Sequence, residues 1–174
     1  MEKNMLFWRM TEPFEELLSA KECATNLVEI LQAIGQTVAT AESCTGGLVS
    51  SAIVSVPGAS RVFCNGFITY CDEAKHRLLG VLEETLAVHT AVSAETAAEM
   101  AYGCAKSGQA DLAVAVTGLA GPDGDEFGRP VGTVFVGFCD GPRTLAKQYR
   151  FSGDREAVRQ QAIEAALNLI LEYV

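Results

Sequence analysis

The chain has few basic residues and no long apolar run. Among its 174 residues, 13 are Lys or Arg and 22 are Asp or Glu, which gives a formal net charge of −9. This balance argues against DNA or RNA as the main partner, because nucleic-acid binding depends on clustered Lys and Arg. No stretch approaches the roughly 20 apolar residues of a membrane-crossing helix, and charged residues interrupt the N-terminus where a signal peptide would have its apolar core. We therefore expect a cytoplasmic protein with no nucleic-acid or membrane partner.

Histidine is scarce and the cysteines are not paired in sequence. His76 and His89 are the two histidines, and no two cysteines form a CxxC motif. Zinc sites and histidine-dependent triads are therefore poorly supported, and we expect no metal. The cysteines, expected to be reduced and mostly structural, are Cys23, Cys44, Cys64, Cys71, Cys104 and Cys139.

The order of expected elements indicates an α/β protein. The 49% hydrophobic content suits one domain with its own core. Helical periodicity and strand-like runs alternate along the chain, which predicts a three-layer α/β/α sandwich, and consecutive strands around the turn at 140–142 predict a mixed central sheet. Residues 1–10 show no clear periodicity and are interpreted as a loosely attached tail or a subunit contact. The expected helices are 20–34, 45–56, 72–80, 93–107 and 154–173; the expected strands are 37–41, 64–71, 112–117, 132–139 and 145–151.

Several helix ends carry local signals. Ser19 followed by Glu22 has the form of a capping box, and Gly35 lies where a helix-ending glycine belongs. Asp72 and Ser93 are expected to be N-caps of their helices. These positions set the boundaries of the expected helices.

The segment TAESCTGG at 40–47 lies at an expected strand-to-helix turn. A serine at such a turn can attack a carbonyl while backbone N–H groups hold the developing oxyanion. Ser43 is the candidate nucleophile, although Ser43 or Thr45 could instead be an ordinary N-cap. Cys44 is a competing nucleophile, because a thiolate at a helix N-terminus can have a lowered pKa; a buried, inert cysteine is the other interpretation.

The segment TYCDEAK at 69–75 places Lys75 in the first turn of an expected helix. This end of the helix dipole disfavours a positive charge, so the pKa of Lys75 would be lowered, as a lysine base for a serine requires. Tyr70 is the candidate assisting group. A solvated lysine on a helix surface is the alternative.

Two further segments could bind an anion. The glycine-rich loop 117–124 follows an expected strand, where ligands of α/β sheets gather, and Thr117 adds a hydroxyl. Arg155 lies at the start of the last helix, where a guanidinium and free amides can hold a phosphate. The alternatives are a surface loop and a surface arginine paired with Asp154 or Glu156.

Five ordered blocks together resemble a known family. They are ATAESCTGGLVSSAIVSVPGAS at 39–60, GFITYCDEAKHRLLGV at 66–81, AVSAETAAEMA at 91–101, AVTGLAGPDG at 115–124 and PVGTVFVGF at 130–138. In these blocks the chain resembles the CinA C-terminal domain family, the nicotinamide-nucleotide amidases, from about residue 20 to its end.

The resemblance implies hydrolysis of nicotinamide mononucleotide to nicotinate mononucleotide and ammonia, with no metal or organic cofactor. It implies Ser43 as nucleophile, Lys75 as general base and Tyr70 as the group that assists proton transfer or orients the lysine. The implied domain covers 19–174, after an N-terminal extension at 1–18 that can contribute to a homo-oligomer. The implied substrate-binding residues are Thr45, Gly46, Gly47, Thr117, Gly118, Gly121 and Arg155, and backbone N–H groups near the first three would hold the oxyanion.

Two departures from the family pattern bear on activity. The family usually has Tyr-Ser-Asn-Glu-Ala-Lys where this chain has Tyr-Cys-Asp-Glu-Ala-Lys, and the charge of Asp72 would stabilise protonated Lys75. The loop at 123–126 carries three acidic residues, which would repel a phosphate unless Arg129 offsets them. A catalytically silent nucleotide-binding paralogue and an amidase for another small amide are therefore the competing interpretations.

Overall fold

The predicted helix signals at Ser19, Gly35 and Ser93 are confirmed. In the computed structural model, helix α1 (Ala20–Ile34) begins with a capping box, in which the Ser19 hydroxyl accepts from the N–H of Glu22 and the Glu22 carboxylate accepts from the N–H of Ser19. The helix ends at Gly35, whose φ of 68° is in the left-handed region that glycine adopts readily. The Ser93 hydroxyl caps helix α5 (Ala94–Gly108).

Two helical features differ from the prediction. The N-cap of α3 (Asp72–Leu79) is Cys71, so Asp72 is the first helical residue and not the cap. Helix α4 (Glu83–His89) was not predicted. The Glu99 carboxylate accepts from the N–H of Leu82 at 2.8 Å, just before this helix, and this partner is 17 positions away in sequence. A contact of that range leaves no local periodic signal.

The structure describes residues 5–8 and 18–174, and its six strands form one mixed sheet in the order β1-β6-β5-β4-β2-β3. Strand β2 lies parallel to β3 and β4, whereas β5 lies antiparallel to β4 and β6. The remaining elements are β1 (Met5–Trp8), β2 (Val38–Glu42), α2 (Leu48–Val54), a 3-10 turn (Ala59–Arg61), β3 (Phe63–Ile68), β4 (Leu112–Gly118), β5 (Thr133–Cys139), β6 (Thr144–Arg150) and α6 (Arg155–Leu171).

Strand β1 was not predicted and pairs in parallel with β6. It lies within the segment 1–10, which was interpreted as a loosely attached tail. The other residues predicted to belong to the N-terminal extension, apart from residue 18, fall at 1–4 and 9–17, outside the described residues.

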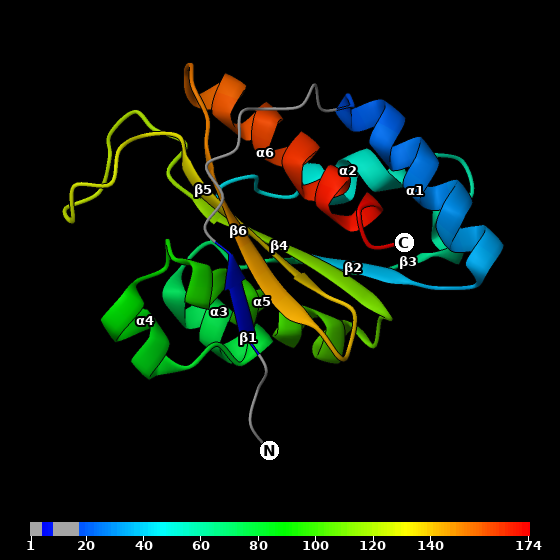
Figure 1. The fold of residues 1–174 in the computed structure, drawn as a ribbon, viewed down its shortest axis with the longest axis horizontal. Helices are drawn as coiled ribbons and strands as arrows, with labels where there is room; N and C mark the ends of the chain where they lie inside the picture. The colour runs from blue at the N-terminus through cyan, green and yellow to red at the C-terminus, as the bar shows by residue number, and fades with distance from the viewer. Residues whose placement is uncertain (1–4, 9–17) are drawn as a thin grey trace.

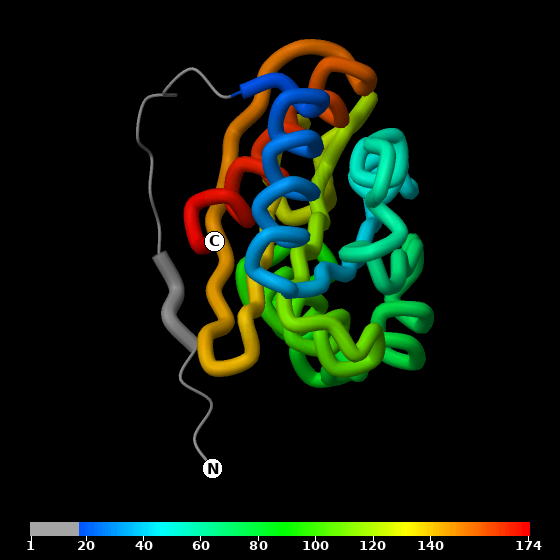
Figure 2. The backbone as a smooth tube through the Cα atoms, turned by 90° about the vertical axis from the view of Figure 1, so that its right-hand side faces the viewer, coloured from blue at the N-terminus to red at the C-terminus, as the bar shows by residue number. Residues whose placement is uncertain are grey.

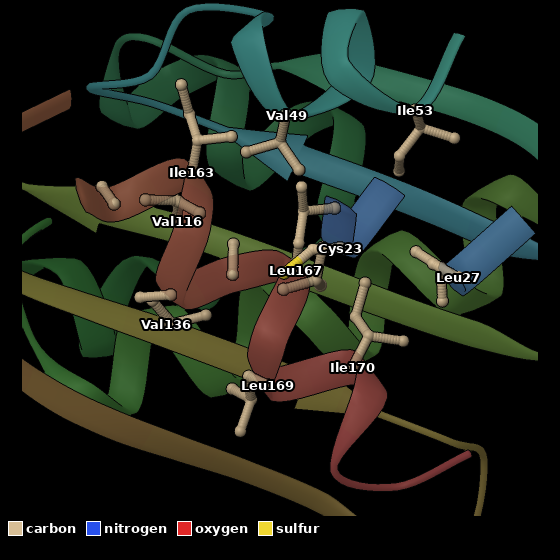
Figure 3. Packing of buried hydrophobic residues seen from close by; sticks show 14 of the residues in the cluster. Cys23, Leu27, Val49, Ile53, Val116, Val136, Ile163, Leu167, Leu169 and Ile170 are labelled. Carbon is tan, nitrogen blue, oxygen red and sulfur yellow. The ribbon is translucent and has the colours of Figure 1, made fainter. Parts of the chain in front are cut away.

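Helices cover both faces of the sheet, which confirms the predicted α/β/α sandwich. Helices α1, α2 and α6 lie on one face, and α3, α4 and α5 lie on the other (Figure 1). The larger core lies under α1, α2 and α6, where side chains such as Leu27, Val49 and Leu167 meet residues of the sheet (Figure 3). Across residues 5–8 and 18–174, every helix is too short or too polar to cross a membrane.

Candidate active site

Ser43 follows a fully buried strand at the centre of the parallel part of the sheet. Strand β2 ends at Glu42, and the N–H of Ser43 donates to the carbonyl oxygen of Val116 in β4 at 3.0 Å. The serine is 9% exposed. It therefore lies at the carboxyl ends of parallel strands, where ligands of α/β sheets bind.

Lys75 reaches the same position from the neighbouring strand. After β3, the N–H of Thr69 donates to the carbonyl oxygen of Glu42 at 2.8 Å, and the chain then enters α3. The Nζ of Lys75 lies 3.4 Å from the Oγ of Ser43 and donates to the carbonyl oxygen of Thr69 at 3.0 Å. Lys75 is only 1% exposed. The alternative of a solvated surface lysine is therefore wrong.

Burial lowers the pKa of Lys75 from its ordinary value, because the protonated amine loses its hydration. The Asp72 carboxylate, with its Oδ1 4.0 Å from Nζ, raises the pKa, and Cys71 and Cys44 also raise it. The net direction is downward, so burial outweighs Asp72, whose side chain is 60% exposed and screened by solvent. At a given pH the neutral amine that a general base requires is therefore more populated at Lys75 than at an ordinary lysine.

Cys44 does not have the properties of a nucleophile. Its side chain is buried, and this burial raises the pKa of the thiol to about 11. A neutral thiol is a poor nucleophile. The structure therefore favours the interpretation of Cys44 as an inert, buried cysteine.

The turn between Ser43 and α2 is formed by two glycines in the left-handed region. Gly46 has a φ of 63° and Gly47 a φ of 100°, conformations that residues with a Cβ rarely adopt. Gly47 is the N-cap of α2, which has no side-chain cap hydrogen bond. The alternative that Ser43 or Thr45 is an ordinary N-cap is therefore wrong.

Glu42 is a site residue that the sequence analysis missed. Its fully buried carboxylate accepts from the N–H groups of Gly47, Val49 and Ser50 at 2.8–3.0 Å and from the Ser50 hydroxyl at 2.7 Å. The partial positive charge at the N-terminus of α2 also stabilises a negative charge at this position. The signal that could have identified it is a charged residue at the end of an otherwise uncharged strand.

The expected oxyanion donors are partly engaged in this structure. The N–H of Gly47 donates to Glu42 at 2.9 Å, and the N–H of Gly46 donates to the carbonyl oxygen of Ser43 at 3.1 Å. Both groups therefore stabilise the turn itself. This finding corrects the expectation that they are free donors.

Arg159, also missed by the sequence analysis, holds the turn through its carbonyl groups. Its Nε donates to the carbonyl oxygen of Cys44 at 3.1 Å, and its Nη2 donates to that of Thr45 at 3.0 Å. It lies one helical turn after Arg155 in α6, and this spacing of four is the signal that places both on one side of the helix.

Three of the predicted residues from separate segments meet beside this turn. The Nη1 of Arg155 donates to the carbonyl oxygen of Gly121 at 2.6 Å, and its Nη2 donates to the hydroxyl of Tyr70 at 3.2 Å. Arg155 and Tyr70 are both exposed. The structure therefore offers an exposed guanidinium at the start of α6, an arrangement suited to an anion.

Thr117 and Gly118 make structural contacts within the protein. The Thr117 hydroxyl is buried and donates to the carbonyl oxygen of Ala91 at 2.7 Å. A Cβ at Gly118 would come within 2.7 Å of the carbonyl oxygen of Thr133, so this glycine permits close packing of β4 on β5. Neither observation points to a phosphate contact.

Two buried hydroxyls near the candidate pair lack a partner. Among the described residues, the Oγ1 atoms of Thr45 and Thr69 are buried side-chain polar atoms without a hydrogen bond. Such atoms are rare in folded proteins and often mark a site that another polar group completes. Both belong to the segments that carry Ser43 and Lys75.

The acidic loop is folded against the α4–α5 connection. Asp125 forms an ion pair with Arg129, whose Nη2 also donates to the Thr90 hydroxyl at 2.6 Å and whose Nη1 donates to the carbonyl oxygen of Val92. Arg129 therefore offsets the charge of Asp125 within the loop.

Comparison with known proteins identifies similar sequences over most of the chain. A model of the CinA C-terminal domain matches residues 20–174. The nicotinamide-nucleotide amidohydrolase PncC of Escherichia coli strain K12 is 48% identical over 143 residues, covering 82% of this chain and 87% of that protein. PncC of Enterobacter agglomerans is 49% identical over 152 residues, covering 86% of this chain and 92% of that protein.

Longer proteins and solved structures are also similar. A CinA-like protein of Chloroherpeton thalassium is 48% identical over 148 residues, but this chain spans only 35% of its length. The crystal structure of competence damage-inducible protein A from Klebsiella pneumoniae matches with a TM-score of 0.87 at 38% identity, covering 90% of this chain and 97% of that chain. A CinA superfamily protein from Escherichia coli matches with a TM-score of 0.89 at 33% identity, covering 95% and 96%.

Proposed function

This chain belongs to the CinA C-terminal domain family, and we propose that it hydrolyses the carboxamide of nicotinamide mononucleotide to nicotinate mononucleotide and ammonia. The observation that carries the proposal is the buried pair of Ser43 and Lys75, with 3.4 Å between Oγ and Nζ. Relatives named nicotinamide-nucleotide amidohydrolase, which are 48% and 49% identical and are covered over most of their length, support the substrate.

In the acylation step, the Oγ of Ser43 attacks the carboxamide carbon and its proton passes to the neutral amine of Lys75. The tetrahedral intermediate then collapses as the carbon–nitrogen bond breaks, and Lys75 returns the proton to the leaving nitrogen, which departs as ammonia. The lowered pKa of Lys75 supports both of its roles, as acceptor of the serine proton and as donor of a proton to the leaving nitrogen.

In the deacylation step, water attacks the ester carbon formed on Ser43. Lys75 accepts a proton from this water and returns it to the serine oxygen as the ester bond breaks, which releases nicotinate mononucleotide. Both steps use side chains already present, so the mechanism requires no metal or organic cofactor.

The binding roles follow from the neighbouring groups. Arg155, exposed at the N-terminus of α6, holds the phosphate of the mononucleotide. The Tyr70 hydroxyl, which accepts a hydrogen bond from Arg155 in this structure, orients the substrate or assists proton transfer. The unpartnered hydroxyl of Thr45 contacts the substrate. Glu42 and Arg159 maintain the turn that carries these groups.

Ammonia release from purified protein and nicotinamide mononucleotide tests the proposal. We expect release by the wild type and a loss of at least about 10³-fold in both Ser43→Ala and Lys75→Ala variants. Ser51→Ala and Lys106→Ala are matched controls, because both side chains are exposed and lie outside the site. Calorimetric binding of nicotinamide mononucleotide to Ser43→Ala should persist.

Two results would overturn the proposal. Binding of the mononucleotide by folded wild type without ammonia release would identify a catalytically silent paralogue. Ammonia release from another small amide, but not from nicotinamide mononucleotide, would show that the protein is an amidase with a different substrate.

A further inference from the structure

Thr69 is a buried threonine whose hydroxyl has no role in the steps described so far. Its exposed fraction is 0%, and within residues 5–8 and 18–174 its Oγ1 is a buried side-chain polar atom without a hydrogen bond. Burying a hydroxyl without a partner costs stability, so such groups in native proteins are usually satisfied by a protein group or an ordered water. The hydroxyl of Thr69 therefore indicates a polar partner other than the described residues.

The side chains of Thr69 and Ser43 are directed to the same face of the sheet. The backbone N–H groups of both residues donate to the neighbouring strand, so the ladders continue one residue beyond β3 and β2. Because side chains alternate along a strand, Thr69 shares a face with Phe67, and Ser43 shares a face with Ala41. Ala41 and Phe67 are paired in register and belong to the core beside α3 and α5. Both hydroxyls therefore lie on the face that carries Lys75.

The intervening side chains are directed to the opposite face. The Glu42 carboxylate accepts from N–H groups at the start of α2, and a Cβ at Gly47 would lie 3.1 Å from the Cδ1 of Ile68. Helix α2 lies on one face of the sheet and α3 on the other (Figure 1), and Figure 2 shows the two helices from the side of the domain. Thr69 therefore belongs to the surroundings of Lys75, not to the turn that precedes α2.

Thr69 already contacts the proposed base through its backbone. The Nζ of Lys75 donates to the carbonyl oxygen of Thr69 at 3.0 Å and lies 3.4 Å from the Oγ of Ser43. Lys75 is 1% exposed and Thr69 0%, whereas Tyr70 and Arg155, proposed to contact the mononucleotide, are exposed. The partner of the Thr69 hydroxyl must therefore be small. A water molecule meets this requirement, because buried waters typically bond to polar groups that are otherwise unsatisfied.

We propose that Thr69 is a further catalytic residue, whose hydroxyl and the amine of Lys75 together hold the water molecule that hydrolyses the acyl-enzyme. The inference rests on the proposed amidase function. After acylation the Oγ of Ser43 carries no proton, so the lone pair of the neutral amine is free to accept one hydrogen of this water. The Oγ1 of Thr69 accepts the other hydrogen, which leaves a lone pair of the water oxygen for the ester carbon.

The step balances with the groups present. The water oxygen bonds to the ester carbon as one proton passes to Lys75. The ester bond to Ser43 then breaks, and the same proton passes from Lys75 to the serine oxygen. The hydrogen held by Thr69 stays on the product carboxyl group, which releases it to solvent. Thr69 therefore contributes to deacylation and not to the release of ammonia.

Two substitutions separate the hydroxyl of Thr69 from its shape. Thr69→Val keeps the shape and removes the hydroxyl, whereas Thr69→Ser keeps the hydroxyl and removes a methyl group. Thr25→Val is the matched control, because the Thr25 hydroxyl donates to the carbonyl oxygen of Lys21 within α1, on the face of the sheet opposite to α3. Circular dichroism and Tm check that each variant folds.

Rapid-quench kinetics separate the two steps, because ammonia leaves in acylation and nicotinate mononucleotide in deacylation. With nicotinamide mononucleotide, Thr69→Val should release ammonia in the first turnover at nearly the wild-type rate. The methyl ester of nicotinate mononucleotide acylates more readily than the amide, so deacylation limits its turnover. Thr69→Val should hydrolyse this ester at least about 10-fold more slowly and accumulate the acyl-enzyme in intact-protein mass spectra. Thr69→Ser and Thr25→Val should hydrolyse it at close to the wild-type rate.

A crystal structure of the wild type supplies a test that needs no variant. An ordered water should lie within about 3.2 Å of both the Oγ1 of Thr69 and the Nζ of Lys75. Absence of this water, ester hydrolysis by Thr69→Val at the wild-type rate, or equal slowing of ammonia release and ester hydrolysis would overturn the inference while the amidase function stands. Absence of ammonia release from folded wild type would overturn the amidase function itself, and the role of Thr69 with it.

Discussion

The side-chain nitrogen of Lys75 lies 3.4 Å from the hydroxyl oxygen of Ser43, although the two residues are 32 positions apart in the sequence. Parallel pairing of β2 with β3 produces this proximity, because it aligns the ends of the two strands from which the residues follow. Burial of the pair removes water from the amine and lowers its pKa. The same arrangement therefore places the two side chains within hydrogen-bond distance and lowers the pKa of the amine, as the proposed serine–lysine mechanism requires.

The first prediction concerns the pH dependence of the proposed reaction. Asp72 raises the pKa of Lys75, so Asp72→Asn should lower that pKa further. Since the base acts as the neutral amine, the acidic limb of kcat/KM should move to lower pH in this variant. Glu73→Gln, which changes the adjacent exposed acid, should leave the limb in place. A shift of the Asp72→Asn limb to higher pH would contradict the assignment of Lys75 as base.

The second prediction concerns stability. Lys75 has a lower pKa in the folded chain than its ordinary value of 10.5 in the unfolded chain. Between these two values Lys75 binds more protons in the unfolded chain than in the folded chain, so this lysine contributes a part of the free energy of unfolding that rises with pH. Lys75→Met lacks this contribution, and its free energy of unfolding relative to wild type should fall as pH rises through the window. Urea titrations at several pH values measure it.

The matched control is Lys106→Met, because Lys106 is exposed. Its free energy of unfolding relative to wild type should stay nearly constant over the same window. If the two variants gave the same pH dependence, the pKa of Lys75 would not be lowered by folding.

The third prediction concerns Glu42, whose carboxylate accepts four hydrogen bonds in the turn. Glu42→Gln places an amide N–H₂ against backbone donors, which should reduce the free energy of unfolding by about 3 kcal/mol. Ser50→Ala removes one of the four bonds to Glu42 and also the 2.7 Å hydrogen bond between the hydroxyls of Ser50 and Thr40, and it should cost about 2 kcal/mol. Urea unfolding of both variants gives the comparison, and equal costs would show that the carboxylate does not organise the turn.

The fourth prediction concerns Arg155. If its exposed guanidinium holds the substrate phosphate, Arg155→Ala should raise KM for nicotinamide mononucleotide by about 10- to 100-fold with a smaller effect on kcat, since a bidentate charged contact is worth a few kcal/mol. The variant should also lose its preference for the mononucleotide over nicotinamide riboside, which lacks the phosphate. Arg77→Ala, at an exposed position of α3, should retain both properties. An unchanged preference in Arg155→Ala would place the phosphate elsewhere.

Most features that depend on neighbours in the sequence were predicted correctly; the N-cap expected at Asp72 is the exception, because Cys71 occupies that position. The capping box at Ser19, the helix end at Gly35 and the cap at Ser93 each involve contacts within five residues. The alternation of helices and strands was sufficient to predict the α/β/α layers. Helix α4 was not predicted from the sequence, because a contact that stabilises its start comes from Glu99, which is distant in the sequence.

By itself, the sequence determined the helices and strands other than β1 and α4, the family resemblance and the residue types at the candidate site, because periodicity, caps and motifs are local properties. Only the tertiary structure decided that Lys75 is buried against Ser43, that Glu42 and Arg159 hold the turn, and that β3 lies at the edge of the sheet. The physical reason is that the order of strands in a sheet depends on long-range packing. That order brings together residues such as Cys44 and Arg159, which are 115 positions apart.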